Sequence, residues 1–227
     1  NEYYSMMGFV YTSDGTDYTE LVRQELGLPE MNGEKMVRLD SDKAEQYKQQ
    51  AIEELTAAGV TFPVEIDYYI SGSNQVSLDS ANVLKQCFSD SLGDDYVTLN
   101  IMTYVSSSQQ EVIAPSLHSA LFGYGWGADY GDPQNYLVQE SYGNDNAYYS
   151  NTYTNINKVE ENEYTADLIN SYKEFTSMLE EADKITDDLD ARYQTFAKAE
   201  AYLIQHGLSI PQYCGTGWCL TKIDLYS

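Results

Sequence analysis

The stretch that decides the fold runs from Val64 to Ile101 and reads VEIDYYISGSNQVSLDSANVLKQCFSDSLGDDYVTLNI. Apolar side chains alternate with mostly polar ones over residues 64–70 and again over 97–101, a pattern that predicts two half-buried strands. Between them, apolar residues recur at helical spacing over Ser77–Leu92, and Gly93 supplies the stop. The stretch therefore predicts a strand, a helix and a second strand.

The same order of elements continues on both sides of this stretch. A helix is predicted upstream from Asp42 to Gly59, with Asp42 as N-cap and Glu45 completing a capping box. Downstream, a short helix over Gln109–His118 and an apolar strand over Ala120–Tyr124 are predicted. Alternating strands and helices favour an α/β fold, a mixed β-sheet flanked by helices.

The chain changes character beyond Pro133. Residues Tyr142–Asn157 are rich in Tyr, Asn, Ser and Thr without helical periodicity, which predicts an exposed loop. Two longer helices are predicted to follow, over Tyr164–Glu181 and Asp188–Gln205. No internal repeat is visible, and we expect residues 1–227 to form a single domain.

Composition indicates a folded, strongly acidic protein. The chain has 227 residues, 42% of them hydrophobic, with 22 tyrosines, 12 Lys+Arg and 36 Asp+Glu, for a formal net charge of −24. So many aromatic residues argue against a disordered acidic tail. The negative field repels nucleic acid and anionic lipid, so nucleic acid is not an expected partner. The chain contains no apolar run of about 18 residues, the length that a membrane span needs.

No metal or cofactor is expected. The three cysteines leave at least one thiol unpaired within the chain, and they lack zinc-site spacing: Cys87, Cys214 and Cys219. Cys214 and Cys219 are spaced closely enough to bridge a small turn. The oxygens of Asp129, Asp132 and Asn135 are spaced like part of a calcium loop, but a proline interrupts them and no closing Glu follows.

The strongest candidate site is Gly125-Trp126-Gly127-Ala128-Asp129-Tyr130, which follows the last predicted strand. Open α/β sheets bind ligands at the carboxyl ends of their strands. Gly125 and Gly127 leave the backbone uncovered for a ligand to approach. Trp126 and Tyr130 offer flat apolar walls, and Asp129 offers an anionic acceptor. The competing interpretation is a tight turn with a buried Trp126.

Charge indicates which end of a ligand this segment would hold. Between Lys85 and Lys158 the chain has no Lys or Arg, and His118 is the only potential cation. A ligand held here is therefore anchored through an amine, by Asp129 or another carboxylate, rather than through its own carboxylate. The overall acidity of the chain also makes such a gap common by chance.

Catalytic patterns are weak. His118 and His206 lie far apart in the sequence, and His206 is expected at a helix end. Ser119 beside His118 has no visible third partner for a nucleophile. The glycines at 123, 125 and 127 lack the rest of either nucleotide-binding pattern. The tyrosines over 142–153 suit stacking on sugars, but a plain surface loop is the default.

Residues 126–133, WGADYGDP, resemble the W-x-A-D-Y-x-D-P signature of the family 5 extracellular solute-binding proteins. Asp42–Gly59 is similar to the family's "D-x-x-K-A-x-x-x-L-x-x-A-G" helix, and Arg192–Pro211 to its "R-x-x-x-Y-x-x-A-E-x-x-L…I-P-x-Y" segment. The resemblance spans roughly residues 43–213. These proteins are the oligopeptide- and dipeptide-binding components of ABC importers, with nickel and some sugar binders among their relatives.

The resemblance implies one lobe of a periplasmic-binding-protein-like (type II) fold, excised from a larger two-lobe protein. It implies that Asp129 pairs with the α-amino group of a peptide and that backbone near Trp126 adds strand-like hydrogen bonds. Implied partners are the missing first lobe, a peptide and a permease. The implied location is extracytoplasmic, either periplasmic or as a cell-surface lipoprotein whose only membrane contact is a lipid anchor. Residues 121–125 lack the basic residue that some relatives carry there, which disfavours short peptides held at both ends.

The sequence hypothesis is a non-enzymatic, peptide-binding lobe of an importer. Other ligands in the same class are a nickel chelate or an oligosaccharide. A secreted hydrolase would need a carboxylate pair, for which Asp129 and Asp132 are the local candidates. A purely structural surface domain would bury Trp126 completely.

Overall fold

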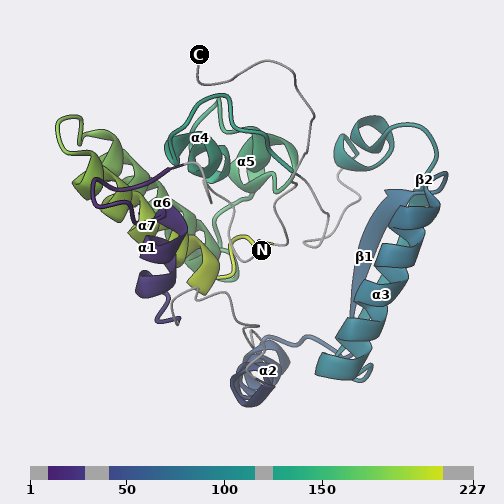
Figure 1. Ribbon diagram of the computed structural model, residues 1–227. Helices are drawn as coiled ribbons and strands as arrows, with labels where there is room; N and C mark the ends of the chain where they lie inside the picture. Colours follow the sequence, from purple (N-terminus) through teal and green to yellow (C-terminus); the bar gives the residue numbers. More distant parts are fainter. Residues whose placement is uncertain (1–9, 29–40, 116–124, 212–227) are drawn as a thin grey trace. The chain divides into compact units, whose positions relative to one another are not determined.

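A computed structural model describes residues 10–28, 41–115 and 125–211 of the chain (Figure 1). The chain divides into two compact units, which we describe separately. One comprises residues 33–125 and 151–155, and the other comprises residues 1–32, 126–150 and 156–227.

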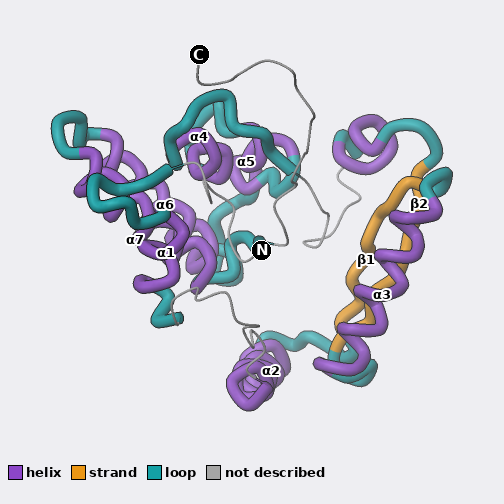
Figure 2. The backbone as a smooth tube through the Cα atoms, in the orientation of Figure 1, coloured by secondary structure: helices purple, strands orange, loops and turns teal. Residues whose placement is uncertain are grey.

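The strand–helix–strand prediction is confirmed in the first unit. Strands β1 (Val64–Ser71) and β2 (Val97–Tyr104) are parallel and pair in register from Val64 opposite Val97 to Ser71 opposite Tyr104. Helix α3 (Gln75–Leu92) is the crossover and lies along both strands (Figure 2). A parallel pair requires such a crossover because a tight turn cannot return the chain in the same direction. The two described strands thus form the sheet of an α/β fold.

Local signals explain the limits of α3. The side chain of Asn74 accepts a hydrogen bond from the Ser77 backbone N–H, 3.1 Å away, so the helix starts two residues earlier than predicted. Gly93 ends it at a φ of +86°, a conformation that favours glycine. Of the α3 residues predicted to face the sheet, Ala81 is the one that is buried.

Helix α2 (Ser41–Ala57) confirms the predicted helix but not its cap. Asp42 lies inside the first turn, so the prediction that Asp42 is the N-cap is wrong. The residue before Ser41 lies outside the described residues. Gly59 ends the region at a φ of +83°, as predicted. Lys48 Nζ donates to the Leu92 carbonyl at the end of α3, 3.1 Å away.

Beyond β2, a π-helical turn, η1 (Gln109–Ile113), occupies the start of the helix predicted over Gln109–His118. The carboxylate of Glu111 accepts the backbone N–H groups of residues 105, 106 and 107, which lowers the pKa of Glu111 to about 2. The end of that helix and the whole predicted strand over Ala120–Tyr124 lie outside the described residues.

The second unit is helical. Helices α1 (Tyr18–Glu25) and α6 (Ala166–Asp183) both pack against α7 (Leu189–Gln205), which confirms the two predicted C-terminal helices (Figure 1). Asp188 caps α7 by accepting from the Ala191 backbone N–H at 2.9 Å. The largest fully buried apolar side chains of this core are Tyr18, Phe175, Phe196, Leu137, Ile169 and Leu203. His206 caps the C-terminal end of α7 and stacks on Tyr202, as predicted for a helix end.

The prediction of an exposed loop over Tyr142–Asn157 is wrong. The segment contains α5 (Tyr148–Thr152) and a 3₁₀ turn, η3 (Ile156–Lys158), and it buries four side chains of its own: Ala147, Tyr149, Ser150 and Ile156. Polar side chains accept several of its backbone N–H groups. Thr176 Oγ1 accepts from Tyr142 N at 2.8 Å, and Asn157 Oδ1 accepts from Gly143 N at 2.8 Å. Such bonds let an aperiodic segment pack without forming a long helix.

None of the helices in the described ranges is long and apolar enough to cross a membrane.

We expect Phe175→Ala to lower the free energy of unfolding of the helical unit by about 3–5 kcal/mol, because it leaves a cavity in a closely packed core. Phe175 is 0% exposed, whereas Leu168 on the same helix is 45% exposed. Leu168→Ala is therefore the matched control and should cost no more than about 1 kcal/mol. Urea unfolding followed by circular dichroism measures the free energy of unfolding of both variants. Equal losses of stability would contradict the assignment of Phe175 to the core.

Candidate functional site

From Trp126 onwards, the candidate segment belongs to the helical unit, and it leads into α4 (Gln134–Leu137) and a 3₁₀ turn, η2 (Val138–Glu140). Residues 125–128 form no helix or strand. Trp126 is half-buried, and the other residues from Gly125 to Tyr130 are exposed. Complete burial of Trp126, which a purely structural domain would require, is not observed.

A buried asparagine holds this segment. Asn135 is 5% exposed, and its Oδ1 accepts two hydrogen bonds. One comes from the indole Nε1–H of Trp126 and the other from the backbone N–H of Asp129, each at 3.0 Å. Because one oxygen receives both donors, the indole ring and the backbone of Asp129 are fixed relative to each other.

Asp132 ties the end of the segment to the helical core. Its Oδ1 accepts from the Gln134 backbone N–H at the start of α4, 2.9 Å away. Arg192 of α7 donates to both carboxylate oxygens, through Nε at 2.9 Å and Nη2 at 3.1 Å. Such bidentate contacts fix the orientation of the carboxylate relative to the guanidinium as well as their distance.

Arg192 is itself held from several sides. It donates to the carbonyls of Ala182 and Ile185 and to Asp183, and its guanidinium lies 4.7 Å from the centre of the Phe196 ring. Burial lowers the pKa of Arg192, but its bonds to Asp132 and Asp183 outweigh burial and raise that pKa above the usual value. Arg192 therefore stays charged, and the Asp132 carboxylate is committed to structure.

The tyrosine-rich segment over residues 142–153 also contacts Trp126. The Trp126 ring lies 5.8 Å from that of Tyr148 and 6.0 Å from that of Tyr149, between ring centroids. Gln139, 6% exposed, links the two segments. Its Nε2 donates to the Asn135 carbonyl, and its Oε1 accepts from the Tyr148 backbone N–H, both at 3.1 Å.

Asp129 differs from Asp132 in that no described residue bonds to its carboxylate. Its side chain is exposed, and within the part of the chain that the structure describes it has no hydrogen-bond or ion-pair partner. The two aspartates are therefore not a matched pair of catalytic carboxylates, because Asp132 is occupied by Arg192. The oxygens of Asp132 and Asn135 that suggested part of a calcium loop also bind protein donors instead.

The glycines of the segment are not required by the fold of the described residues. A Cβ placed on Gly125, Gly127 or Gly131 would meet no atom within 4 Å, and none of the three has a positive φ. Within the described residues, no atom therefore stands over the backbone at Gly125 and Gly127.

The sequence analysis named Trp126 and Asp129, which the structure holds against the same Asn135 oxygen. It did not include in the site four residues that hold or adjoin this segment: Asn135, Gln139, Tyr148 and Arg192. Gly127 lies exposed between the two anchored residues, and Gly125 is the last residue of the other unit in this part of the chain. Tyr130 is 52% exposed, and its hydroxyl donates to Gln134 Oε1. Asn135 was visible only as a possible oxygen ligand three residues after Asp132.

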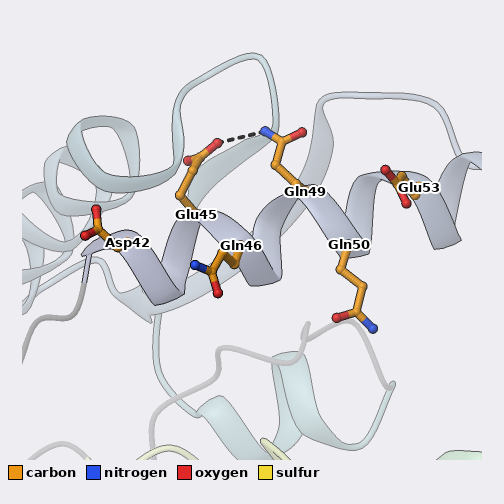
Figure 3. Close-up of a pocket in the computed structure, with 6 residues that line it drawn as sticks. All are labelled: Asp42, Glu45, Gln46, Gln49, Gln50 and Glu53. Carbon is orange, nitrogen blue, oxygen red and sulfur yellow. Dashed lines mark hydrogen bonds between the residues drawn. The ribbon is translucent and has the colours of Figure 1, made fainter.

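Two surface hollows lie elsewhere. One follows the side of α2 and is lined by Asp42, Glu45, Gln46, Gln49, Gln50 and Glu53, and Figure 3 shows these side chains spread along a single helix with Glu45 bonded to Gln49. The other lies between residues 141–146 and α6. Neither hollow is lined by residues 125–132. The described residues contain no group of three or more His, Cys, Asp or Glu that could hold a metal ion.

The sequence is similar to oligopeptide-binding proteins of streptococci. It is 29% identical over 175 residues to oligopeptide-binding protein AliB of Streptococcus pneumoniae serotype 4 (strain ATCC BAA-334 / TIGR4), which is 75% of this chain and 26% of AliB. It is 28% identical over 233 residues to oligopeptide-binding protein SarA of Streptococcus gordonii (strain Challis), which is 93% of this chain and 33% of SarA. The chain thus spans about a quarter to a third of the length of these curated relatives. No family model matches it.

Solved structures agree on the fold. The pheromone receptor PrgZ, described with its mode of peptide binding, matches 87% of this chain and 30% of its own with a TM-score of 0.54 at 19% identity. The periplasmic murein tripeptide binding protein MppA, in an unliganded open form, matches 78% of this chain and 29% of its own with a TM-score of 0.51 at 16% identity. The α/β fold of these binding proteins and the resemblance to them are therefore confirmed.

We expect Arg192→Leu to lower the free energy of unfolding by about 2–4 kcal/mol, because it leaves the Asp132 carboxylate without its partner. The side chains of Arg192 and Asp132 are 14% and 20% exposed. Lys173→Leu is the matched control, since it breaks an ion pair with Glu161 whose side chains are 45% and 55% exposed. That change should cost about 0–1 kcal/mol in the same urea titration. Similar losses for both variants would contradict an anchoring role for Arg192.

Proposed function

We propose that this chain is a ligand-binding lobe of an oligopeptide-binding protein and that Asp129 receives the α-amino group of the peptide. The observation that carries the proposal is the exposed Asp129 carboxylate, which has no partner within the described residues although its own backbone N–H is fixed by Asn135. A charged group held in place but left unpaired is suited to an external cation.

Local charge supports an amine rather than a carboxylate at this position. The neighbouring negative charge of Asp132 is neutralised by Arg192. The sequence between Lys85 and Lys158 carries no Lys or Arg that would compete for Asp129 or attract a ligand carboxylate. The strongly acidic chain also favours the approach of cationic groups over anionic ones.

The open backbone supports a peptide in particular. Residues 125–128 are in neither a helix nor a strand, and no side chain covers Gly127. An extended peptide can place its own backbone donors and acceptors against such a segment, as in β-augmentation. The half-buried ring of Trp126 and the 42%-exposed ring of Tyr148 form an apolar wall for a peptide side chain.

The rest of the proposal follows from the relatives, which are named as oligopeptide-binding proteins. The lobe would close on the peptide against a first lobe, remain outside the cytoplasm as a periplasmic protein or cell-surface lipoprotein, and deliver its ligand to an ABC permease. It would perform no catalysis. The engagement of Asp132 by Arg192 argues against a hydrolase, because the local carboxylate pair is not available.

We expect Asp129→Asn to weaken binding of peptides with a free amino terminus by about 1.5–3 kcal/mol, the contribution of a charge-assisted hydrogen bond. Acetylating the peptide amino group should have a similar effect on the unchanged protein and little further effect on the variant. Calorimetric titration of a peptide library against the two-lobe protein measures this. Asp145→Asn, which removes another exposed carboxylate, is the control. Peptide binding that is insensitive to both Asp129→Asn and acetylation would rule out the amine anchor, and tighter binding of a nickel chelate or an oligosaccharide would identify another ligand class.

We expect Gly127→Ala to weaken peptide binding by about 1–3 kcal/mol through steric interference with the peptide backbone, with little change in stability. Gly131→Ala is matched to it, since both positions are open and neither has a positive φ. Gly131→Ala should leave both stability and affinity unchanged. If Gly127→Ala binds peptides as well as the unchanged protein does, the ligand backbone does not approach this segment.

A further inference from the structure

Asn135 contacts two residues of the proposed site without belonging to its surface. Its Oδ1 lies 3.0 Å from both Trp126 Nε1 and Asp129 N, and the residue is 5% exposed. A ligand on the exposed face of the segment would meet Trp126 and Asp129 rather than Asn135. Any influence of the Asn135 side-chain oxygen on binding therefore acts through those two residues.

The chemistry of the contact requires an acceptor at this position. Both neighbouring atoms are N–H donors, so the amide must present its oxygen to them, and the opposite orientation would place the NH₂ group against two donors. An apolar side chain of similar size would leave the indole and backbone N–H groups without this partner. Asparagine and aspartate both supply the oxygen.

The same helix turn also reaches the tyrosine-rich segment. The carbonyl of Asn135 accepts from Gln139 Nε2, and Gln139 Oε1 accepts from Tyr148 N. The ring of Tyr148 in turn contacts the ring of Trp126, so that Asn135, Gln139, Tyr148 and Trp126 form a closed ring of contacts. Two buried amides, four residues apart, thus connect the proposed amine anchor to the proposed side-chain wall.

We propose that Asn135 is a positioning residue that orients Asp129 and Trp126 for the ligand, an inference that rests on the proposed function of that site. Its oxygen sets the backbone of Asp129, and therefore the direction of the carboxylate, relative to the indole ring. Loss of this oxygen should specifically reduce discrimination between free and blocked peptide amino groups, rather than weaken all binding equally.

The first test examines geometry and needs no ligand. In the two-lobe protein labelled with ¹⁵N-tryptophan, the Trp126 indole resonance is assigned by its loss in Trp126→Phe. We expect this indole proton to exchange slowly with solvent in the unchanged protein and in Asn135→Asp, but at least about tenfold faster in Asn135→Leu. Rapid exchange in the unchanged protein overturns the inference even if Asn135→Leu fails to fold.

The second test examines discrimination. The ratio of Kd for an N-acetylated peptide to Kd for the same peptide with a free amine is measured by calorimetry for each variant. We expect this ratio to fall by about tenfold or more in Asn135→Leu, towards the value for Asp129→Asn, and to be largely retained in Asn135→Asp. Thr176→Val is the control, because it removes a 2.8 Å acceptor from the backbone N–H of Tyr142, away from Asp129. That variant should keep the ratio.

The two tests separate the inference from the function on which it rests. If acetylation does not affect the unchanged protein, the amine-anchor proposal fails, and the exchange measurement still decides whether Asn135 holds Trp126. If acetylation matters in the unchanged protein but the ratio is the same in Asn135→Leu, the amine anchor stands and the positioning role is wrong. An equal fall of the ratio in Thr176→Val would also overturn it, since any lost loop contact would then suffice.

Discussion

The guanidinium of Arg192 closes on both oxygens of Asp132, and the segment that leads into α4 takes its position from this contact. Arg192 is fixed in turn by two backbone carbonyls and by Asp183 near the end of α6. The ion pair therefore connects the rigid α6–α7 packing to a stretch of chain with no regular structure of its own. A loop held in this way can present exposed groups in a defined geometry, which binding sites need.

In the candidate segment, the residues that anchor the chain are different from those proposed to contact the ligand. Asn135 and Asp132 accept hydrogen bonds from protein donors, and Gln139 donates to the Asn135 carbonyl and accepts from Tyr148 N. Asp129 and the backbone around Gly127 are instead exposed. Along the sequence, the exposed residues Gly127 and Asp129 come directly before the anchoring residues Asp132, Asn135 and Gln139. Binding strength and structural stability can thus be altered by different substitutions within the same segment.

Regular elements were predictable where periodicity was strong, as in β1, α3, β2, α6 and α7. The candidate segment could be singled out from the sequence, because Trp126 and Asp129 carry the family resemblance, and its role in binding is the proposal made above. The contribution of Tyr148 was not, because its contact with Trp126 depends on Gln139, an amide that has no periodic or motif signal. Burial over 142–157 was missed for the same reason: polar side chains satisfy the backbone there, and hydrophobic patterning does not report them.

The open glycines have a consequence for how relatives of this protein diversify. Because no described atom lies within 4 Å of a Cβ at Gly125, Gly127 or Gly131, side chains can be added there without disturbing the interior. Under the proposed function, single added side chains there would change ligand contacts without disturbing the interior, whereas loss of Arg192 or Asp132 would break the ion pair that holds the segment. A lobe built in this way would let related proteins differ in ligand contacts while keeping the same fold.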